Sequence, residues 1–337
     1  MTTNLNFSFK NGYTHGGIFH ADDVFSAALL EILKGYKFMI VRGFNPPSED
    51  NPDTIVFDIG GGRFDHHGGD YDARPNGVPY AAFGKLWRRF GRERFGDYVY
   101  KKVDSTLVQE IDAYDNGVVG SQSNISRFIH NLNPSWDDEY LSLMSKDQLT
   151  DKRFEDATAF AKEILMTEIK AAQSVEHAAE YVSGLISRRM YNEILVLDKY
   201  VPWMGEAFKI PELLFCAFPG NRDDGAWNLQ VIPKTPGTRE PRLDVPTYWK
   251  GYNVKNGGAA PVDGMTFCHP SGFLSAFDTL EHAINAANKA IEFSKLEMPK
   301  PDVQGLPNDT MPSVDGEAVD LLFSNTAIVN RLPIEDE

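Results

Sequence analysis

Residues 58–67, Asp-Ile-Gly-Gly-Gly-Arg-Phe-Asp-His-His, constrain the fold more than any other segment of the chain. They follow residues 54–57, Thr-Ile-Val-Phe, whose β-branched and aromatic side chains are typical of a short strand. The three glycines let the backbone turn sharply where a side chain would clash. The turn is followed by Asp65, His66 and His67, three metal-ligand side chains in succession. This order predicts a metal centre at the edge of an α/β sheet.

A second cluster lies upstream, in His15-Gly-Gly-Ile-Phe-His20-Ala-Asp22-Asp23. Residues 22–34 after it read as a helix, because acidic residues open it and Gly35 follows it. Asp23 is expected to serve the N-terminus of that helix. Loops at the carboxyl ends of parallel strands are where α/β sheets place their sites, so we expect both clusters to share one crevice.

The order of elements predicts an α/β protein in several parts. Strands at 37–43 and 54–59, with helices at 22–34, 80–95 and 97–114, favour a parallel sheet with right-handed crossovers. Residues 118–150 look loop-rich, and strand patterns return from 192, followed by a helix at 278–296. We expect a catalytic domain at 1–150, a helical connector at 151–190, a smaller α+β substrate-gripping domain at 191–297 and an acidic, proline-containing tail at 298–337.

The amino-acid composition limits the classes of function that the chain can have. The net charge of −15 disfavours extended binding to a long nucleic acid, although bound metal ions could still attract a phosphate. No stretch approaches the roughly 18–20 apolar residues that span a bilayer, and the N-terminus lacks the pattern of a secretion signal. Cys216 and Cys268 are expected to be buried thiols in a cytoplasmic protein.

The two clusters predict a ligand set for divalent metals. It comprises His15, His20, Asp22, Asp58, His66 and either Asp112 or Asp115. Mixed nitrogen and oxygen ligands suit Mn²⁺, Zn²⁺ or Co²⁺ more than Mg²⁺. Three carboxylates facing two dications leave a formal charge of about +1, which would attract a phosphoryl group. The arginines at 88, 89, 92 and 94 are interpreted as a solvated helix face.

The Asp65-His66-His67 triplet after Asp58 resembles the DHH phosphoesterase superfamily. Within it, the chain is most similar to the melanocyte proliferating gene family, described as metal-dependent protein hydrolases or 3′–5′ exonucleases. The likeness covers roughly residues 12–295 and rests on separated motifs that occur in the family's order. They are Thr14-His-Gly-Gly-Ile-Phe-His-Ala-Asp22, Gly77-Val-Pro-Tyr-Ala-Ala-Phe-Gly84, Glu110-Ile-Asp-Ala-Tyr-Asp-Asn-Gly117, Leu195-Val-Leu-Asp198, Trp227-Asn-Leu-Gln-Val-Ile-Pro233, Pro246-x-x-Trp-x-Gly251 and His269-x-Ser-Gly-Phe273.

The resemblance implies a DHH-type parallel-sheet domain that holds two metals and a C-terminal lobe that grips substrate. It implies one metal on His15, His20 and Asp58, and a second on Asp58 and three further residues. Those three are Asp22, His66 and either Asp112 or Asp115. His67 would contact the substrate phosphate and Asp65 would orient a histidine. In the second lobe, the implied substrate contacts are His269, Ser271 and Gly272, the last two through backbone N–H groups.

We therefore expect a phosphodiesterase or exonuclease-like hydrolase that uses a two-metal-activated water, with Asp58, Asp65 and His67 as catalytic residues. The expected cofactors are two Mn²⁺ ions, with Mg²⁺, Zn²⁺ or Co²⁺ as alternatives. The expected substrate is a nucleic acid end, a short oligonucleotide or a small phosphoester, and no membrane is involved. Two other functions stay open, a metal-stabilised scaffold without turnover and an amide-bond metallohydrolase. The oligomeric state is also open, with a homodimer as one option.

Overall fold

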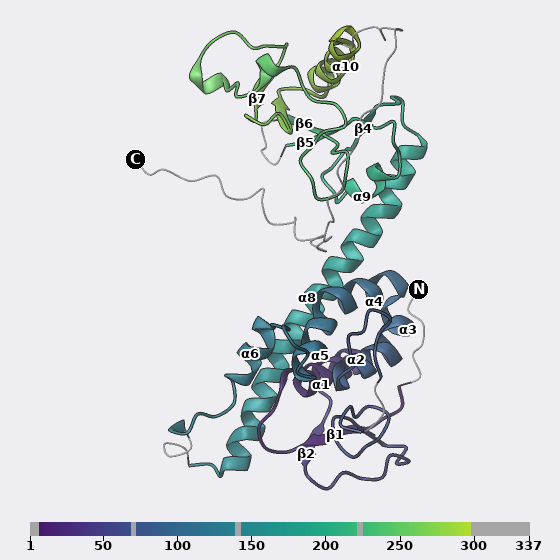
Figure 1. Cartoon of the computed structure of the whole chain (residues 1–337), viewed down its shortest axis with the longest axis vertical. Coiled ribbons are helices and arrows are strands. Elements are labelled where there is room, and N and C mark those ends of the chain that lie inside the picture. Colours follow the sequence, from purple (N-terminus) through teal and green to yellow (C-terminus); the bar gives the residue numbers. More distant parts are fainter. Residues whose placement is uncertain (1–6, 69–71, 139–142, 221–224, 298–337) are drawn as a thin grey trace, which may run out of the picture. The chain divides into compact units, whose positions relative to one another are not determined.

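A computed structural model describes residues 7–68, 72–138, 143–220 and 225–297. The chain divides into two compact units, Met1–Glu176 and His177–Glu337. The first unit contains a three-stranded sheet of order β2-β1-β3, and the second a five-stranded sheet of order β4-β5-β6-β8-β7 (Figure 1). The predicted α/β class, with a parallel sheet first and an α+β part after it, is confirmed. The expected acidic tail at 298–337 lies outside the described residues.

The sheet of the first unit is parallel throughout, as predicted. Its strands are β1 (Asn11–His15), β2 (Ile40–Gly43) and β3 (Thr54–Val56). The central strand β1 was not predicted, because its sequence Asn-Gly-Tyr-Thr-His lacks the apolar run that marks a buried strand. Its position next to β3 brings His15 to the same sheet edge as Asp58.

Helices α1, α2 and α5 pack against one another over this sheet (Figure 1). The helices of the first unit, with α8 continuing into the second, are α1 (Ala21–Lys34), α2 (Ala82–Leu86), η1 (Trp87–Gly91), α3 (Arg92–Phe95), α4 (Asp97–Val103), η2 (Asp104–Val108), α5 (Gln109–Asp115), α6 (Asn124–His130) and α8 (Lys146–Ser187). The predicted helices at 80–95 and 97–114 are present, each interrupted by one π-helical segment, η1 or η2. Helix α6 lies in a stretch that was expected to be loop.

The second unit has its own sheet and core. Its elements after α8 are β4 (Ile194–Val196), α9 (Met204–Phe208), β5 (Phe215–Pro219), β6 (Trp227–Val231), η3 (Thr247–Trp249), η4 (Val254–Asn256), β7 (Met265–Cys268), β8 (Leu274–Phe277) and α10 (Leu280–Glu297). Strands β4 and β5 are parallel and the other pairs are antiparallel. Cys216 and Cys268 are free, buried thiols, as expected. Among the described residues, no helix has the length and apolar composition needed to cross a bilayer.

Asp112 ties α5 to α2 inside the first unit. One of its carboxylate oxygens accepts the backbone N–H of Gly84 at 3.0 Å, and the other accepts Nη2 of Arg74 at 2.8 Å. A Cβ atom at Gly84 would lie 1.8 Å from that second oxygen, so only glycine lets the two helices approach this closely. Burial, opposed by Arg74, raises the pKa of Asp112 to about 7.

Replacing Gly84 with alanine should therefore destabilise the fold by at least about 2 kcal/mol, because the new methyl group displaces a buried, hydrogen-bonded carboxylate. Gly205→Ala in α9 is the matched control, since no heavy atom lies within 4 Å of its added Cβ. The control should be neutral or stabilising by about 0.5 kcal/mol. Urea denaturation of the full chain measures both, and equal stability of the two variants would contradict the packing described here.

Candidate metal centre

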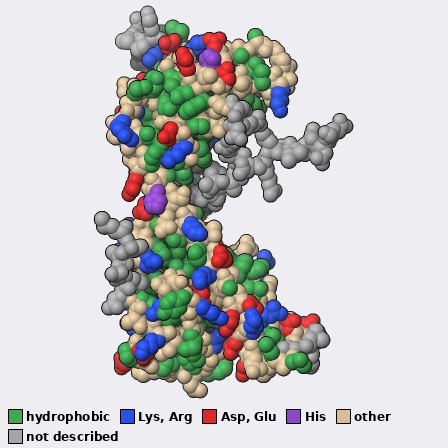
Figure 2. All heavy atoms as spheres, turned by 180° about the vertical axis from the view of Figure 1, so that it is seen from behind, with side chains coloured by type: hydrophobic (Ala, Val, Ile, Leu, Met, Phe, Trp, Pro, Cys, Tyr) green, Lys and Arg blue, Asp and Glu red, His purple; other side chains and the backbone are tan. Residues whose placement is uncertain are grey.

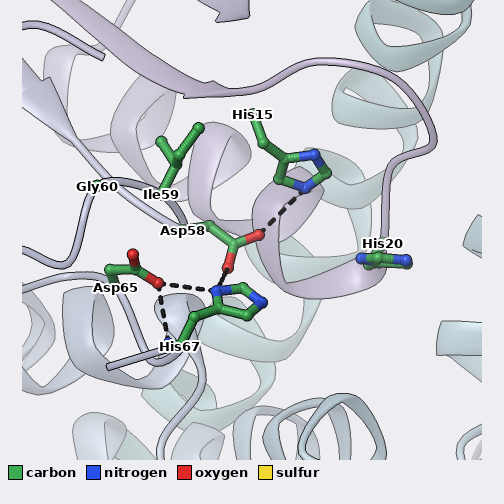
Figure 3. A pocket seen from close by; sticks show the side chains of 7 residues that line it. All are labelled: His15, His20, Asp58, Ile59, Gly60, Asp65 and His67. Carbon is green, nitrogen blue, oxygen red and sulfur yellow. Dashed lines mark hydrogen bonds and ion pairs between the residues drawn. The ribbon is translucent and has the colours of Figure 1, made fainter. Parts of the chain in front are cut away.

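Histidine and aspartate side chains from four elements converge at one edge of the first sheet. Figure 3 shows those that line a pocket there. His15 ends β1, and His20 precedes the first turn of α1, which carries Asp22 and Asp23. Asp58 follows β3, and Asp115 is the last residue of α5. An open pocket of about 380 Å³ lies over this edge. Its lining residues are His15, His20, Asp58, Ile59, Gly60, Asp65 and His67.

Asp58 lies at the middle of the cluster and uses its two carboxylate oxygens on opposite sides. Oδ2 lies 3.3 Å from Nε2 of His15, and Oδ1 lies 3.2 Å from Nδ1 of His66. The backbone of Asp58 is left-handed, with φ of +56°, a conformation that aspartate adopts more readily than most residues. The side chain is 1% exposed. This buried carboxylate thus faces an imidazole on each of its two oxygens.

Asp23 belongs to the same cluster, which the sequence did not reveal. Its Oδ1 accepts the backbone N–H of His20 at 2.9 Å, the expected role at the helix N-terminus. Its Oδ2 lies 3.2 Å from Nε2 of His15. The ligand atoms of His15, Asp23 and Asp58 all lie within 4.8 Å of one another.

A further group contains His20, Asp22 and Asp115, again within 4.8 Å of one another. Asp115 also contacts His66, whose Nε2 lies 2.9 Å from its Oδ2. Of the two aspartates that the sequence left open, Asp115 therefore lies with the cluster. Asp112 does not, because its carboxylate is bound by Arg74 and the N–H of Gly84.

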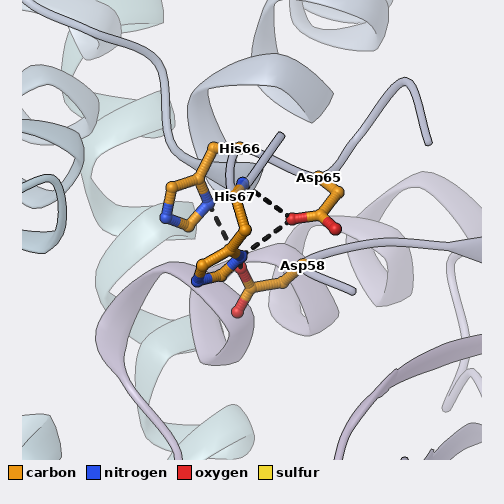
Figure 4. Close-up of side chains that lie close together, drawn as sticks. All are labelled: Asp58, Asp65, His66 and His67. Atoms are coloured by element: carbon orange, nitrogen blue, oxygen red, sulfur yellow. Dashed lines mark hydrogen bonds and ion pairs between the residues drawn. The ribbon is translucent and has the colours of Figure 1, made fainter. Parts of the chain in front are cut away.

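The two imidazoles of the Asp65-His66-His67 triplet lie side by side, with ring centres 4.1 Å apart, but differ in exposure (Figure 4). Asp65 accepts hydrogen bonds from the backbone N–H and from Nδ1 of His67, at 3.0 and 2.8 Å. It also accepts a hydrogen bond from the backbone N–H of Gly61. The side chain of His67 is 62% exposed and lines the pocket, whereas that of His66 is 8% exposed. The triplet thus places one imidazole inside the cluster and holds the other at its surface.

The protonation of the cluster follows from crowding of buried charges. Burial opposes the charged form of His15, but Asp23 and Asp58 outweigh it and raise its pKa to about 11. Burial likewise opposes a charged His66, and Asp115 and Asp58 raise its pKa to about 9. Burial would raise the pKa of Asp58, yet His15 and His66 hold it at about 2. Burial and the nearby Asp58 and Asp115 raise the pKa of Asp22 well above its ordinary value.

The donor set fits divalent cations. Several buried polar atoms of the cluster make no hydrogen bond within the described residues, although some face one another at 3.2–3.8 Å. These atoms are Oδ1 and Oδ2 of Asp22, Oδ2 of Asp23, Oδ1 of Asp58 and Nδ1 of His66. Buried polar atoms are normally paired, so atoms of this kind pointing together form a group that could hold a cation. Asp115 adds a second argument, because a carboxylate at a helix C-terminus is disfavoured by the helix dipole.

The three residues expected to grip substrate from the second unit form the turn between β7 and β8. The N–H of Gly272 donates to the carbonyl of His269 at 2.8 Å, and the N–H of Ser271 donates to Nδ1 of His269 at 3.1 Å. Both backbone donors are therefore engaged inside the turn. The expectation that they bind a phosphate stays a prediction.

The basic helix face is paired with acidic side chains, in line with its interpretation as a solvated surface. Arg88 binds Asp72, Arg89 binds Glu93, and Arg92 binds Asp97. Figure 2 shows lysine and arginine side chains interspersed with acidic ones on the face it presents. The surface visible there thus offers no broad basic field for a long polyanion.

Fold and site together define an α/β protein with a buried histidine–aspartate cluster at the edge of a parallel sheet. A family model labelled MYG1_exonuc and described as Uncharacterised protein family (UPF0160) matches residues 13–291, so the chain belongs to this family. The resemblance drawn from the motifs is thereby confirmed.

Named relatives cover most of the chain. The MYG1 protein C694.04c of Schizosaccharomyces pombe is 27% identical over 325 residues, which are 83% of this chain and 97% of that protein. The MYG1 exonuclease of Mus musculus is 26% identical and covers 82% of this chain and 84% of its own length. The MYG1 protein of Dictyostelium discoideum is 23% identical, with coverage of 83% and 96%.

Among solved structures, the chain is similar to RecJ in complex with Mn²⁺ from Thermus thermophilus, at 13% identity and a TM-score of 0.29. The likeness covers 87% of this chain and 53% of RecJ, so the chain spans about half of that protein's length. A TM-score of this size does not establish a shared fold.

Two substitutions of Asp58, by glycine and by alanine, test whether its backbone adopts the left-handed conformation. Asp58→Gly and Asp58→Ala both remove the carboxylate, but only alanine retains a Cβ that opposes positive φ. The glycine variant should be more stable than the alanine variant by about 1 kcal/mol in urea denaturation. A more stable alanine variant would contradict the assigned conformation.

The raised pKa values of His15 and His66 predict that metal binding releases protons. The two imidazolium groups stabilise the metal-free chain below their ordinary pKa of 6.5, and this stability is lost as pH rises through about 9 and 11. A metal requires the unprotonated nitrogen, so affinity for Mn²⁺ should increase with pH between about 6 and 9. Calorimetry in two buffers of different ionisation enthalpy counts the protons, and a buffer-independent enthalpy would contradict the prediction.

Proposed function

We propose that the chain is a metal-dependent phosphodiesterase of the DHH type that removes nucleotides from a nucleic acid end or cleaves short phosphoesters. The observation that carries this proposal is the position of Asp58, whose two oxygens face His15 and His66 among further buried carboxylates. Relatives that carry the name exonuclease support the reaction class. The Asp65-His66-His67 triplet after Asp58 supports the DHH assignment.

The residues that would hold two divalent ions are His15, His20, Asp22, Asp23, Asp58, His66 and Asp115. When bound, such ions polarise a phosphoryl oxygen and lower the pKa of water. Asp58 faces His15 with one oxygen and His66 with the other, so it would serve the ligand sets on both sides. Mn²⁺ is the proposed metal because the donor set mixes imidazole nitrogens with carboxylate oxygens.

His67 is the proposed contact to the scissile phosphate. Asp65 accepts Nδ1 of His67 at 2.8 Å, which fixes the ring and leaves Nε2 free to donate to a phosphate oxygen when the imidazole is charged. Three hydrogen bonds, one from Gly61 and two from His67, outweigh burial and lower the pKa of Asp65, so it stays ionised as the orienting group.

Substrate length follows from the surface around the site. The pocket of about 380 Å³ is of the size that small ligands occupy. The arginines at 88, 89 and 92 of the same unit are each paired with a carboxylate. These features favour a nucleotide end or a short oligonucleotide over a long duplex. In the second unit, His269, Ser271 and Gly272 remain proposed substrate contacts.

Asp58→Asn and His66→Ala should each lower phosphodiesterase activity by at least about a thousandfold, since each removes a group at the centre of the ligand set. Release of nitrophenol from bis-nitrophenyl phosphate and shortening of labelled DNA and RNA oligonucleotides, with and without Mn²⁺, measure the loss. His282→Ala is the matched control, because the ring of His282 pairs with Asp278 in the second unit and belongs to none of the candidate ligand groups of the described residues. Full activity of either site variant would refute the proposal, and an inactive wild type that still binds Mn²⁺ would favour a metal-stabilised scaffold.

A further inference from the structure

The loop that carries the first two histidines has little packing of its own. It runs from His15 at the end of β1 to His20 at the start of α1. Gly16 and Gly17 contribute no side chain, and Ile18 is 59% exposed. Only Phe19 is fully buried. A loop with one anchoring side chain needs hydrogen bonds to hold its histidines in a fixed arrangement.

Asn133 supplies such hydrogen bonds to the residue that precedes His20. Its Oδ1 accepts the backbone N–H of Phe19 at 3.0 Å, and its Nδ2 donates to the carbonyl of Phe19 at 2.9 Å. The same Nδ2 also donates to the carbonyl of His130 at the end of α6, which fixes the amide itself. A carboxamide is suited to this task because it carries a donor and an acceptor side by side.

Arg42 holds the other side of the same loop. Its Nη2 donates to the carbonyl of Gly17 at 2.6 Å, while Nη1 binds Asp151 of α8 at 2.8 Å. The side chain is 2% exposed and its guanidinium lies 4.5 Å from the ring centre of Phe154. The loop is thus fastened to β2 and to the segment after α6, both remote from it in sequence.

We propose that Asn133 is a positioning residue, which holds the Phe19–His20 peptide so that the imidazole of His20 faces Asp22 and Asp115. This inference rests on the proposed metal centre, because His20 is an exposed residue at the end of that loop and its role is that of a metal ligand. Asn133 itself is only half-buried, so its replacement should leave the fold intact. Groups around metal ligands of this kind typically change metal affinity by about 10- to 100-fold when removed.

The test compares Asn133→Ala with Asn131→Ala in the full chain. Asn131 follows α6 directly and is exposed, and its side chain makes no hydrogen bond within the described residues. Asn133→Ala should weaken Mn²⁺ binding about 10- to 100-fold and leave the thermal midpoint close to that of Asn131→Ala. At full occupancy with Co²⁺, its visible spectrum should differ from that of the wild type, since the spectrum reports ligand geometry.

Hydrogen exchange of the Phe19 amide tests the contact without any metal. In Asn133→Ala it should exchange roughly tenfold faster, because its acceptor is lost. Asn133→Asp keeps the acceptor and loses the donor, so it should retain protection and still bind Mn²⁺ weakly. Unchanged exchange in Asn133→Ala, or unchanged Mn²⁺ affinity and Co²⁺ spectrum, would refute the positioning role. A wild type that binds no divalent metal, with Phe19 exchange still accelerated in Asn133→Ala, would instead refute the proposed metal centre and leave the contact established.

Discussion

The burial of several carboxylates within reach of one another is the constraint on which the first unit depends. Asp22, Asp23 and Asp58 are almost fully buried, and Asp115 is largely so. Like charges in a poorly solvated place cannot all remain ionised unless cations or protons balance them. In the metal-free chain the balance comes from protons on His15, His66 and Asp22. The fold therefore contains a cluster that protons neutralise, and in the proposed metal-bound form divalent cations would take their place.

The inclusion of Asp23 changes the electrostatics expected from the sequence. A ligand set with three carboxylates leaves two dications with a formal charge of about +1, whereas four carboxylates leave no excess. Attraction of a phosphate would then depend on local groups rather than on net charge. His67 at the pocket surface is such a group, and Asp65 holds it in place. The two histidines of the triplet therefore differ in position, with one imidazole buried in the cluster and the other exposed at the pocket.

The parts predictable from sequence are those that depend on local pattern. Helix α1 has acidic residues in its first turn and Gly35 at its end, and β3 is a compact apolar run, so both were found. Strand β1 was missed because it is the central strand of the sheet although its sequence has no run of apolar side chains. The sequence identified Asp23 only as a residue at the helix N-terminus. The contact of its second oxygen with His15 became apparent only from the folded structure. Asn133 and Arg42 gave no signal, since their partners lie 114 and 25 residues away.

The supporting contacts explain how a site built partly on loops can hold its geometry. Asp58 follows a strand in a left-handed conformation, and backbone strain at such a position persists only where the surroundings dictate it. Here the N–H of Asp58 donates to the carbonyl of Phe64, which closes the glycine turn and brings the triplet back toward the sheet. Asp112 and Arg74 anchor the helix that ends in Asp115, while Asn133 and Arg42 anchor the loop that ends in His20. Each ligand segment is thus fixed by a residue outside the cluster, which is what a pre-organised metal centre requires.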